Sequence, residues 1–97
     1  MKPLISIIIP VYNRSDIILH TLDSVMKQRY ENFECILVDD GSTDKTLSVI
    51  SKYALIDRRF KVYSRPVEMR KGPSSCRNFG FYKSTGAYIK WFDSDHI

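Results

Sequence analysis

Cysteine is scarce in this sequence, which excludes a disulfide framework and argues against a thiolate metal site. The two cysteines, Cys35 and Cys76, stand 41 positions apart in apolar segments, with no Cys-x-x-Cys pair and no neighbouring histidine at metal-ligand spacing. We therefore expect two buried free thiols in a reducing, cytoplasmic setting.

Long hydrophobic runs are missing as well. The longest apolar stretch, from Leu4 to Val11, is interrupted by Pro10 and is far shorter than the roughly 20 residues that a membrane-spanning helix requires. No small-residue cleavage site of an export signal follows it. We expect no membrane segment in this chain, with attachment of a longer full-length protein to the cytoplasmic face of a membrane as the alternative.

An excess of positive charge is confined to the second half of the chain. Residues 1–50 carry five Lys or Arg and seven Asp or Glu, whereas residues 51–97 carry ten and four, for a net charge of +4. These basic residues form no RNA-binding signature, so we expect a solvated face with a local anion site and no nucleic-acid partner. The 43% hydrophobic and 27% charged residues are typical of one globular domain.

Apolar runs alternate with amphipathic segments along the chain. The pattern predicts strands over residues 5–9, 33–38, 60–63 and 88–92. It predicts helices from Ser15 to Gln28, from Thr43 or Asp44 through Ala54, and from Pro73 to Ser84. Such alternation is typical of the α/β class, an open parallel sheet built from βαβ units with helices on both faces.

Polar residues follow three of the four predicted strands. Tyr12-Asn13 comes after the first strand, Asp39-Asp40 after the second and Asp93-Ser94-Asp95 after the fourth. Because ligands bind outside the carboxyl ends of the strands in open α/β sheets, the sequence predicts a binding site at this edge.

Asp93 and Asp95 are the candidate metal ligands. Two carboxylates one residue apart at a strand end point to the same side and can approach one hard cation, Mg2+ or Mn2+, together with diphosphate oxygens. An Asp-x-Asp is also an ordinary solvated turn, so the pair alone does not decide between the two interpretations.

Asp40, Tyr12 and Arg77 are the candidate nucleotide contacts. The Asp40 carboxylate would accept a hydrogen bond from uracil N3–H or a ribose hydroxyl, and the Tyr12 ring would stack on a base. Arg77 would pair with phosphate or with the Asp93 and Asp95 carboxylates. The ordinary alternatives are a rim aromatic for Tyr12 and a surface helix charge for Arg77. His20 and His96 are expected at the surface without a role.

Five motifs stand in a fixed order along the chain. They are Ile7-Ile8-Ile9-Pro10-Val11-Tyr12-Asn13, Leu37-Val38-Asp39-Asp40-Gly41-Ser42-Thr43-Asp44, Gly72 with Arg77-Asn78-Phe79-Gly80, Gly86-Ala87-Tyr88-Ile89, and Phe92-Asp93-Ser94-Asp95. This ordered set resembles the N-terminal half of a GT-A-fold, family 2 glycosyltransferase. The resemblance implies a Rossmann-like nucleotide-diphospho-sugar transferase fold, truncated after the fourth strand, in which residues 1–97 form the nucleotide-sugar-binding half of one domain.

The resemblance also implies roles for individual residues. Pro10, Tyr12, Asn13 and Asp40 would hold the base and ribose, Asp93 the ribose or the metal, and Asp95 would be the principal metal ligand, while Asp39 would order its turn. Arg77 would support the diphosphate, with Arg70 or Lys71 as the alternative basic residue near the base. The family usually has a third acid where this sequence has His96, a departure that could alter the preference between Mn2+ and Mg2+.

The activity implied by the resemblance is transfer of a sugar from a nucleotide-sugar donor, expected to be a UDP-sugar, to a hydroxyl of a carbohydrate or lipid-linked acceptor. The displacement would be inverting. The family's general base is a carboxylate well downstream of the Asp-x-Asp, so we expect this chain to hold the donor site and to transfer no sugar by itself. The family's strand order, 3-2-1-4, would leave residues 88–92 as an exposed edge open to self-association.

Two other classes compete with this interpretation. A phosphoacceptor receiver domain is also a small parallel α/β fold, but its acid pair follows the first strand and its acceptor Asp the third. Here the first strand ends in Pro-Val-Tyr-Asn and the third in Tyr63-Ser64-Arg65. A non-catalytic nucleotide-binding module is the second alternative.

Overall fold

The computed structural model describes residues 2–92, in which strands and helices alternate. The strands are β1 (Ile5–Val11), β2 (Phe33–Asp39), β3 (Phe60–Ser64) and β4 (Tyr88–Trp91). The helices are α1 (Ile18–Lys27), α2 (Thr46–Ile56) and α3 (Pro73–Lys83). This succession confirms the predicted βαβ architecture.

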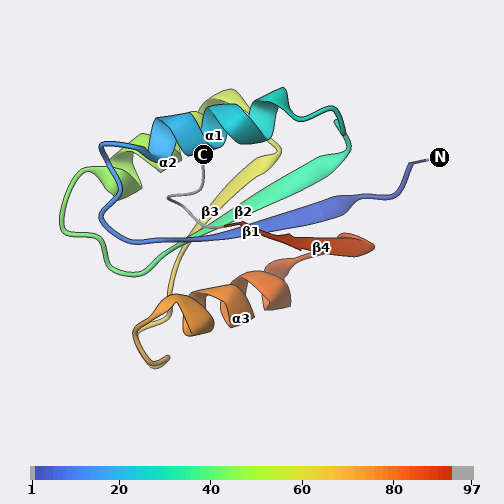
Figure 1. Cartoon of the computed structure of the whole chain (residues 1–97). Coiled ribbons are helices and arrows are strands. Elements are labelled where there is room, and N and C mark those ends of the chain that lie inside the picture. The colour runs from blue at the N-terminus through green and yellow to red at the C-terminus, as the bar shows by residue number, and fades with distance from the viewer. Residues whose placement is uncertain (1, 93–97) are drawn as a thin grey trace.

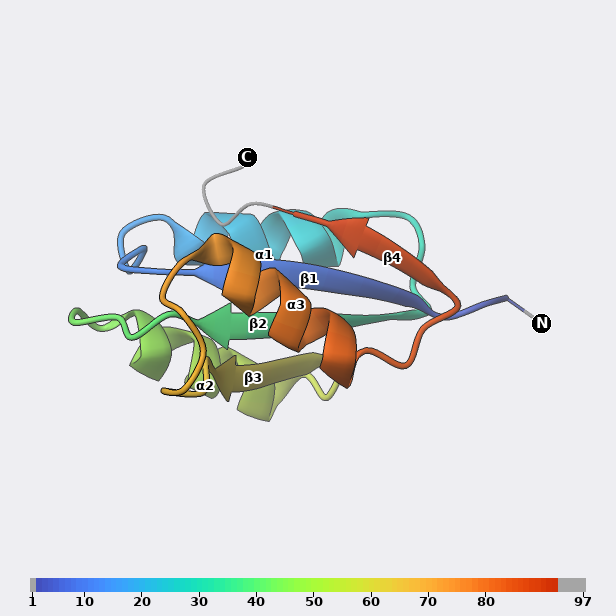
Figure 2. The same ribbon diagram turned by 90° about the horizontal axis from the view of Figure 1, so that it is seen from below.

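All the strands described are parallel and lie in the order β3-β2-β1-β4, as predicted. The register pairs Val11 with Asp39, and Asp39 with Ser64, so the carboxyl ends of three strands are level with one another. The loops that follow these ends therefore emerge together at one edge of the sheet (Figure 2).

The sheet has a different core on each face. α1 and α2 cover one face and α3 covers the other (Figure 1). The larger core includes alternate residues of β1, namely Ile7, Ile9 and Val11, whereas Ile8 packs with Cys76 beneath α3. Both cysteines are free and buried, as expected.

The first helix begins later than its sequence predicts. The sequence predicts Ser15 as the cap, but α1 starts at Ile18. The reason is a contact with the next loop: the Ser15 hydroxyl donates to Asp44 Oδ2 at 2.9 Å. Asp44 is likewise outside α2, where its Oδ1 accepts from the Thr46 N–H at 2.9 Å. The second helix therefore begins at Thr46 rather than at residue 43 or 44.

The first strand extends through Pro10, although proline is rare in a central strand. The Ile8 carbonyl accepts from Phe92 N–H on the β4 side. Because the bonding side alternates from one residue to the next, Pro10 faces β4 as Ile8 does, and the described pairing with β4 ends at Ile8 and Trp91. Its missing N–H thus breaks no bond to β2.

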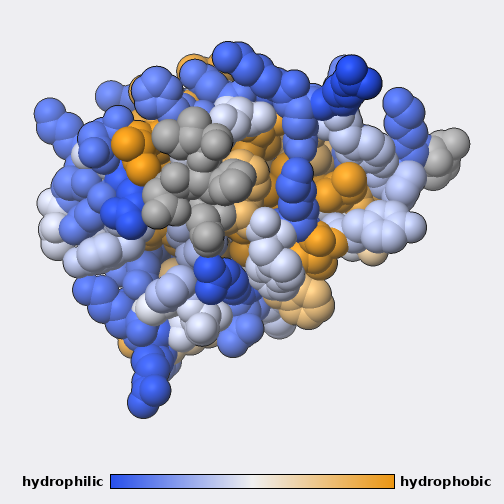
Figure 3. Space-filling model, in the orientation of Figure 1, coloured by the Kyte–Doolittle hydropathy of each residue, from blue (hydrophilic) through white to orange (hydrophobic). Residues whose placement is uncertain are grey.

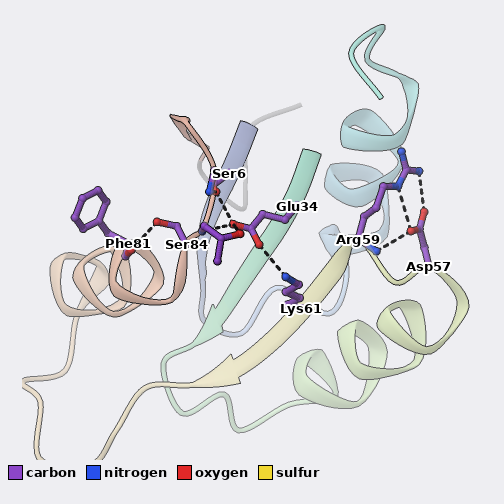
Figure 4. A network of polar contacts seen from close by, with 9 residues as sticks. Ser6, Glu34, Asp57, Arg59, Lys61, Phe81 and Ser84 are labelled. Atoms are coloured by element: carbon purple, nitrogen blue, oxygen red, sulfur yellow. Dashed lines mark hydrogen bonds and ion pairs between the residues drawn. The ribbon is translucent and has the colours of Figure 1, made fainter. Parts of the chain in front are cut away.

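Glu34 is buried near the amino ends of the strands, at the opposite end of the sheet from the loops that follow β1, β2 and β3 (Figure 4). Its Oε1 accepts from Lys61 Nζ at 2.8 Å, and its Oε2 accepts from Ser6 Oγ and from Thr85 N–H at 2.7 Å. The Gly86 N–H in turn donates to Ser6 Oγ at 2.8 Å. This network fastens the loop between α3 and β4 to the other three strands.

The surface is mostly hydrophilic over α1, while apolar side chains gather along the sheet edge at β4 (Figure 3). Tyr88 and Trp91 are 62% and 52% exposed there. None of the helices within residues 2–92 has the length and apolar character needed to cross a membrane.

Candidate functional site at the carboxyl edge of the sheet

Asn13 joins the loop after β1 to the loop after β2. It has a φ of 49°, a left-handed conformation that asparagine tolerates better than most residues. Its main-chain N–H donates to Ser42 Oγ at 2.9 Å, and its Oδ1 accepts from Thr43 N–H at 2.8 Å. The side chain proposed as a nucleotide contact therefore already holds two loops together, and its contact with a nucleotide stays a prediction.

Asp39 orders the turn that follows β2, as predicted. Its Oδ2 accepts from the main-chain N–H groups of Gly41 at 3.1 Å and Ser42 at 2.9 Å, and its Oδ1 accepts from the Ser42 hydroxyl. Gly41 has a φ of 86°, which a side chain would strain. Asp39 is 2% exposed, so its carboxylate is committed to the loop.

Asp40 is paired with Arg65, the first residue after β3. Arg65 Nε donates to Asp40 Oδ1, and the two side chains are 14% and 8% exposed. The main chain adds two bonds: Asp40 N–H donates to Val11 O and Arg65 N–H to Asp39 O, both at 2.8 Å. The carboxylate predicted to hold the nucleoside is thus fixed by bonds that join β1, β2 and β3.

Cys76 contacts the same carboxylate from α3. Burial raises the pKa of the Cys76 thiol to about 12, and the nearby charge of Asp40, with which it hydrogen-bonds, acts in the same direction. The thiol therefore stays protonated at neutral pH and does not act as a nucleophile.

Tyr12 lies at the rim of this edge and is 37% exposed. Lys71 Nζ is 4.4 Å from the centre of its ring and donates to its hydroxyl at 3.3 Å. Of the two basic residues considered for the base, Lys71 is therefore the one that contacts Tyr12. Pro10 is buried within β1, two residues earlier.

The structure describes Arg77 but not the two aspartates that are predicted to bind metal. Arg77 is partly buried in α3, immediately after Cys76. Asp93 and Asp95 lie outside the described residues. Within residues 2–92, no three His, Cys, Asp or Glu side chains come together as a possible metal site.

Sequence reasoning missed Arg65 as a member of the site, treating it as one of several scattered basic residues. The signal was its position. Because Asp39 pairs with Ser64 in the parallel register, the residues that follow each of them, Asp40 and Arg65, also lie side by side. When the strand order is known, an acidic and a basic residue at adjacent positions of neighbouring strands are expected to form an ion pair.

Comparison with known proteins gives one consistent family. The family model described as glycosyl transferase family 2 matches residues 6–97. An uncharacterized glycosyltransferase of Haemophilus influenzae is 44% identical over 93 residues, which are 96% of this chain and 36% of that protein. The putative teichuronic acid biosynthesis glycosyltransferase TuaG of Bacillus subtilis is 39% identical over 94 residues, which are 97% and 36%.

Solved structures agree with the fold. The mannosyltransferase PcManGT of Pyrobaculum calidifontis, in complex with GDP-Man and Mn2+, superimposes with a TM-score of 0.86 at 26% identity, over 98% of this chain and 28% of the other. TarS 1–349 of S. aureus, in complex with UDP-GlcNAc, gives 0.81 at 34% identity, over 98% and 27%. The chain thus spans about a third of the length of the two curated relatives named above.

Proposed function

The chain belongs to glycosyl transferase family 2, and from that membership we propose that it is the donor-binding part of an enzyme that transfers a sugar from a nucleoside diphosphate sugar to an acceptor hydroxyl. The observation that carries the proposal is the fixed carboxylate of Asp40 next to the exposed ring of Tyr12, on neighbouring strand ends. A carboxylate acceptor and an aromatic face are what a base and ribose require.

The nucleoside lies between these two residues in our proposal. Asp40 accepts a hydrogen bond from the base or ribose, and Tyr12 stacks on the base. Pro10 and Asn13 hold the backbone on either side of Tyr12 in the conformation that contacts the nucleoside. A UDP-sugar is the proposed donor. TarS was solved with UDP-GlcNAc and PcManGT with GDP-Man. Uracil and guanine, the bases of these two donors, each carry a ring N–H that can donate a hydrogen bond to a carboxylate.

A divalent cation, Mn2+ or Mg2+, fits the residue types that follow β4. The Phe92 N–H donates to Ile8 O, so the described chain runs beside β1 in the direction of the carboxyl edge, and the sequence continues as Asp93-Ser94-Asp95. Carboxylate oxygens are the ligands that such hard cations prefer. We assign Asp95 as the principal ligand and Asp93 to the metal or ribose. When bound, the cation would offset the charge that develops on the leaving diphosphate.

The chain's own residues bind and orient the donor. Asp40 and Tyr12 hold the nucleoside, and Arg77 supports the diphosphate, where a guanidinium can pair with phosphate oxygens. Transfer by a single inverting displacement also requires a general base at the acceptor hydroxyl. Of the carboxylates buried at the described edge, Asp39 is occupied by its own turn, and Asp40 is paired with Arg65 and assigned here to the nucleoside. We place that base, and the carbohydrate or lipid-linked acceptor, outside residues 2–92.

The receiver alternative is excluded by topology. The observed order β3-β2-β1-β4 differs from the order 2-1-3-4-5 of flavodoxin-like folds, to which receivers belong. A non-catalytic nucleotide-binding module would share the Asp40 and Tyr12 contacts, and a transfer assay separates it from the proposed enzyme.

Calorimetric titration of the chain with UDP, with and without Mn2+, tests the metal assignment. We expect Mn2+ to strengthen UDP binding, and Asp95→Ala to remove that dependence. Glu31→Ala, an exposed acid before β2 at the opposite end of the sheet, is the matched control and should behave as wild type. Equal UDP affinity for wild type and Asp95→Ala, with and without metal, would contradict the assignment.

The nucleoside contact is tested with uridine alone. Asp40→Ala removes the acceptor, so we expect uridine to bind about tenfold or more weakly, the usual effect of losing a hydrogen bond to a charged group. Unchanged uridine affinity would rule out the role given to Asp40.

A further inference from the structure

We propose that Arg65 is the positioning residue that makes Asp40 selective for bases carrying a ring N–H. This inference rests on the proposed function, because it concerns how the same site chooses its nucleotide. It assigns a task to a residue that none of the family motifs quoted above includes.

The geometry around Arg65 is that of a built contact, not of a surface ion pair. Its Nε donates to Asp40 Oδ1, and its Nη1 donates to the carbonyl oxygens of Met69 at 2.7 Å and Pro66 at 3.2 Å. The guanidinium is 14% exposed and the carboxylate 8%. A planar guanidinium held at three oxygens has one orientation, so the carboxylate that it contacts is held in one orientation too.

The fixed carboxylate has a defined bonding capacity. Oδ1 accepts from Arg65, and an ionised carboxylate can only accept. An ionised carboxylate has about four acceptor positions, so a ligand N–H can donate to one that Arg65 leaves open. Uracil N3–H and guanine N1–H can donate to it, whereas the unprotonated N3 of cytosine and N1 of adenine present a lone pair and would be repelled.

Arg65 also connects the acid to the stacking side of the site. Its bonds to Pro66 and Met69 hold the first part of the loop between β3 and α3, and the same loop carries Lys71 over the Tyr12 ring. Loss of the guanidinium would free the Asp40 carboxylate to rotate and would loosen the loop that approaches Tyr12. Both effects reduce discrimination between bases more than they reduce binding of the diphosphate.

The test measures the affinities of the chain for UDP and CDP by calorimetry, in the presence of Mn2+. For wild type we expect UDP to bind at least about tenfold more tightly than CDP, the effect of one hydrogen bond to a charged group. Arg65→Met should bring the ratio close to one. Arg65→Lys keeps a cation beside Asp40 but loses the planar contact with the loop carbonyls, so it should recover part of the ratio.

Arg58→Met is the matched control, because Arg58 is an exposed arginine in the connection between α2 and β3. It should leave both affinities unchanged. Asp40→Asn should lower the UDP-to-CDP ratio as Arg65→Met does, and the double variant should lower it no further, since both changes act through one contact. Circular dichroism confirms that each variant is folded.

The outcomes separate the inference from the proposed function. If wild type prefers UDP while Arg65→Met weakens UDP and CDP by the same factor, Arg65 has only a structural role and the inference is overturned. If wild type binds UDP and CDP equally, base selection at Asp40 is wrong although nucleotide binding stands. If wild type binds none of them, the proposed function falls and the inference falls with it.

Discussion

Glu34 is a carboxylate inside a parallel sheet, and its contacts explain why it is tolerated there. Burial alone would raise the pKa of Glu34, but hydrogen bonds from Lys61, Ser6 and the Thr85 N–H outweigh burial and lower it to about 2. An ionised, fully bonded acid of this kind stabilises the fold only while it stays ionised.

We predict that Glu34 makes the stability of the chain fall in acid. Its pKa drops from 4.5 to about 2 on folding, so its contribution is complete above pH 4.5 and is lost as the pH falls through about 2. That difference corresponds to up to about 3 kcal/mol in the free energy of unfolding. Urea unfolding at several pH values should therefore show a flatter pH dependence for Glu34→Gln, together with lower stability at pH 7.

Two comparisons make this measurement specific. Asp44, whose pKa is also lowered to about 2 by the hydrogen bond from the Thr46 hydroxyl, titrates in the same range, so Glu34→Gln should remove only part of the slope. Glu68→Gln, at an exposed acid, should change nothing. An unchanged slope for Glu34→Gln would contradict the prediction.

At the level of residues, local patterns predicted local contacts, while the partners from distant segments were not predictable. The contact of Asp39 with its own turn follows from an Asp-Gly-Ser sequence. Asn13 holding Thr43, and Arg65 holding Asp40, each join segments 25 or more positions apart. Such pairs depend on the strand order, which a single sequence reveals only through resemblance.

At the scale of elements, α3 approaches the sheet unusually closely at Gly80. A Cβ built on Gly80 would lie 2.6 Å from Ile8 Cγ2 and 3.4 Å from Val38 Cγ2, both on the α3 face of the sheet. Because Ile8 is fully buried, it has no free space into which to move. The same helix carries Cys76 to Asp40, so its distance from the sheet also matters for the candidate site.

We predict that Gly80→Ala destabilises the chain although alanine is the better helix former. Overpacking costs about 1–3 kcal/mol, more than the roughly 1 kcal/mol that the helix gains from losing a glycine. Thermal unfolding should show a lower Tm for Gly80→Ala. Asn78→Ala, at an exposed position of α3, should leave the Tm unchanged or slightly higher. A Tm for Gly80→Ala at or above that of wild type would show that α3 can shift.

The fourth strand should be the least protected part of the sheet. β4 pairs only with β1 within the described sheet, and Tyr88 and Trp91 are 62% and 52% exposed. We predict that the Ile89 to Trp91 amides exchange with solvent faster than those of β1 and β2 at low protein concentration. At higher concentration, pairing of this edge between two copies should slow them. Slow exchange in a proven monomer would refute the prediction.

The elements themselves were largely predictable because apolar residues dominate both central strands. Predicted and observed bounds agree within two residues for every strand. The helix starts were less predictable, since Ser15 looks like a cap in the sequence but is bound instead by Asp44 of the following loop. Residues that look like helix caps in this sequence can therefore bind a neighbouring loop and leave their own helix uncapped.

At the scale of the whole molecule, the described part of the carboxyl edge offers no buried carboxylate that is free to act as a general base. The three loops that meet there are linked by Asn13, Asp40 and Arg65. Asp39 accepts from its own turn, and Asp40 is paired with Arg65 and assigned to the nucleoside. A general base needs a free lone pair at the acceptor hydroxyl.

We therefore predict that the chain of 97 residues binds a nucleotide sugar but transfers no sugar to an acceptor. Calorimetry with UDP-GlcNAc and GDP-Man in the presence of Mn2+ should detect binding, while chromatography of the same mixtures with a carbohydrate acceptor should detect no glycosylated product. Slow hydrolysis of the donor is compatible with the prediction. Robust transfer by the purified chain would contradict it and would point to His96 as the base.

The order of the strands also determines how long the centre of the sheet remains incomplete while the protein is being made. β1 is synthesised before the other described strands, yet its second edge pairs with β4, since Ile5 pairs with Tyr88, 83 positions later. At about 5–20 residues per second, a ribosome needs roughly 4–17 s to cover that distance. For this interval the β-branched run Ile7 to Ile9 presents an unpaired backbone edge, which can pair with another chain being made on the same message.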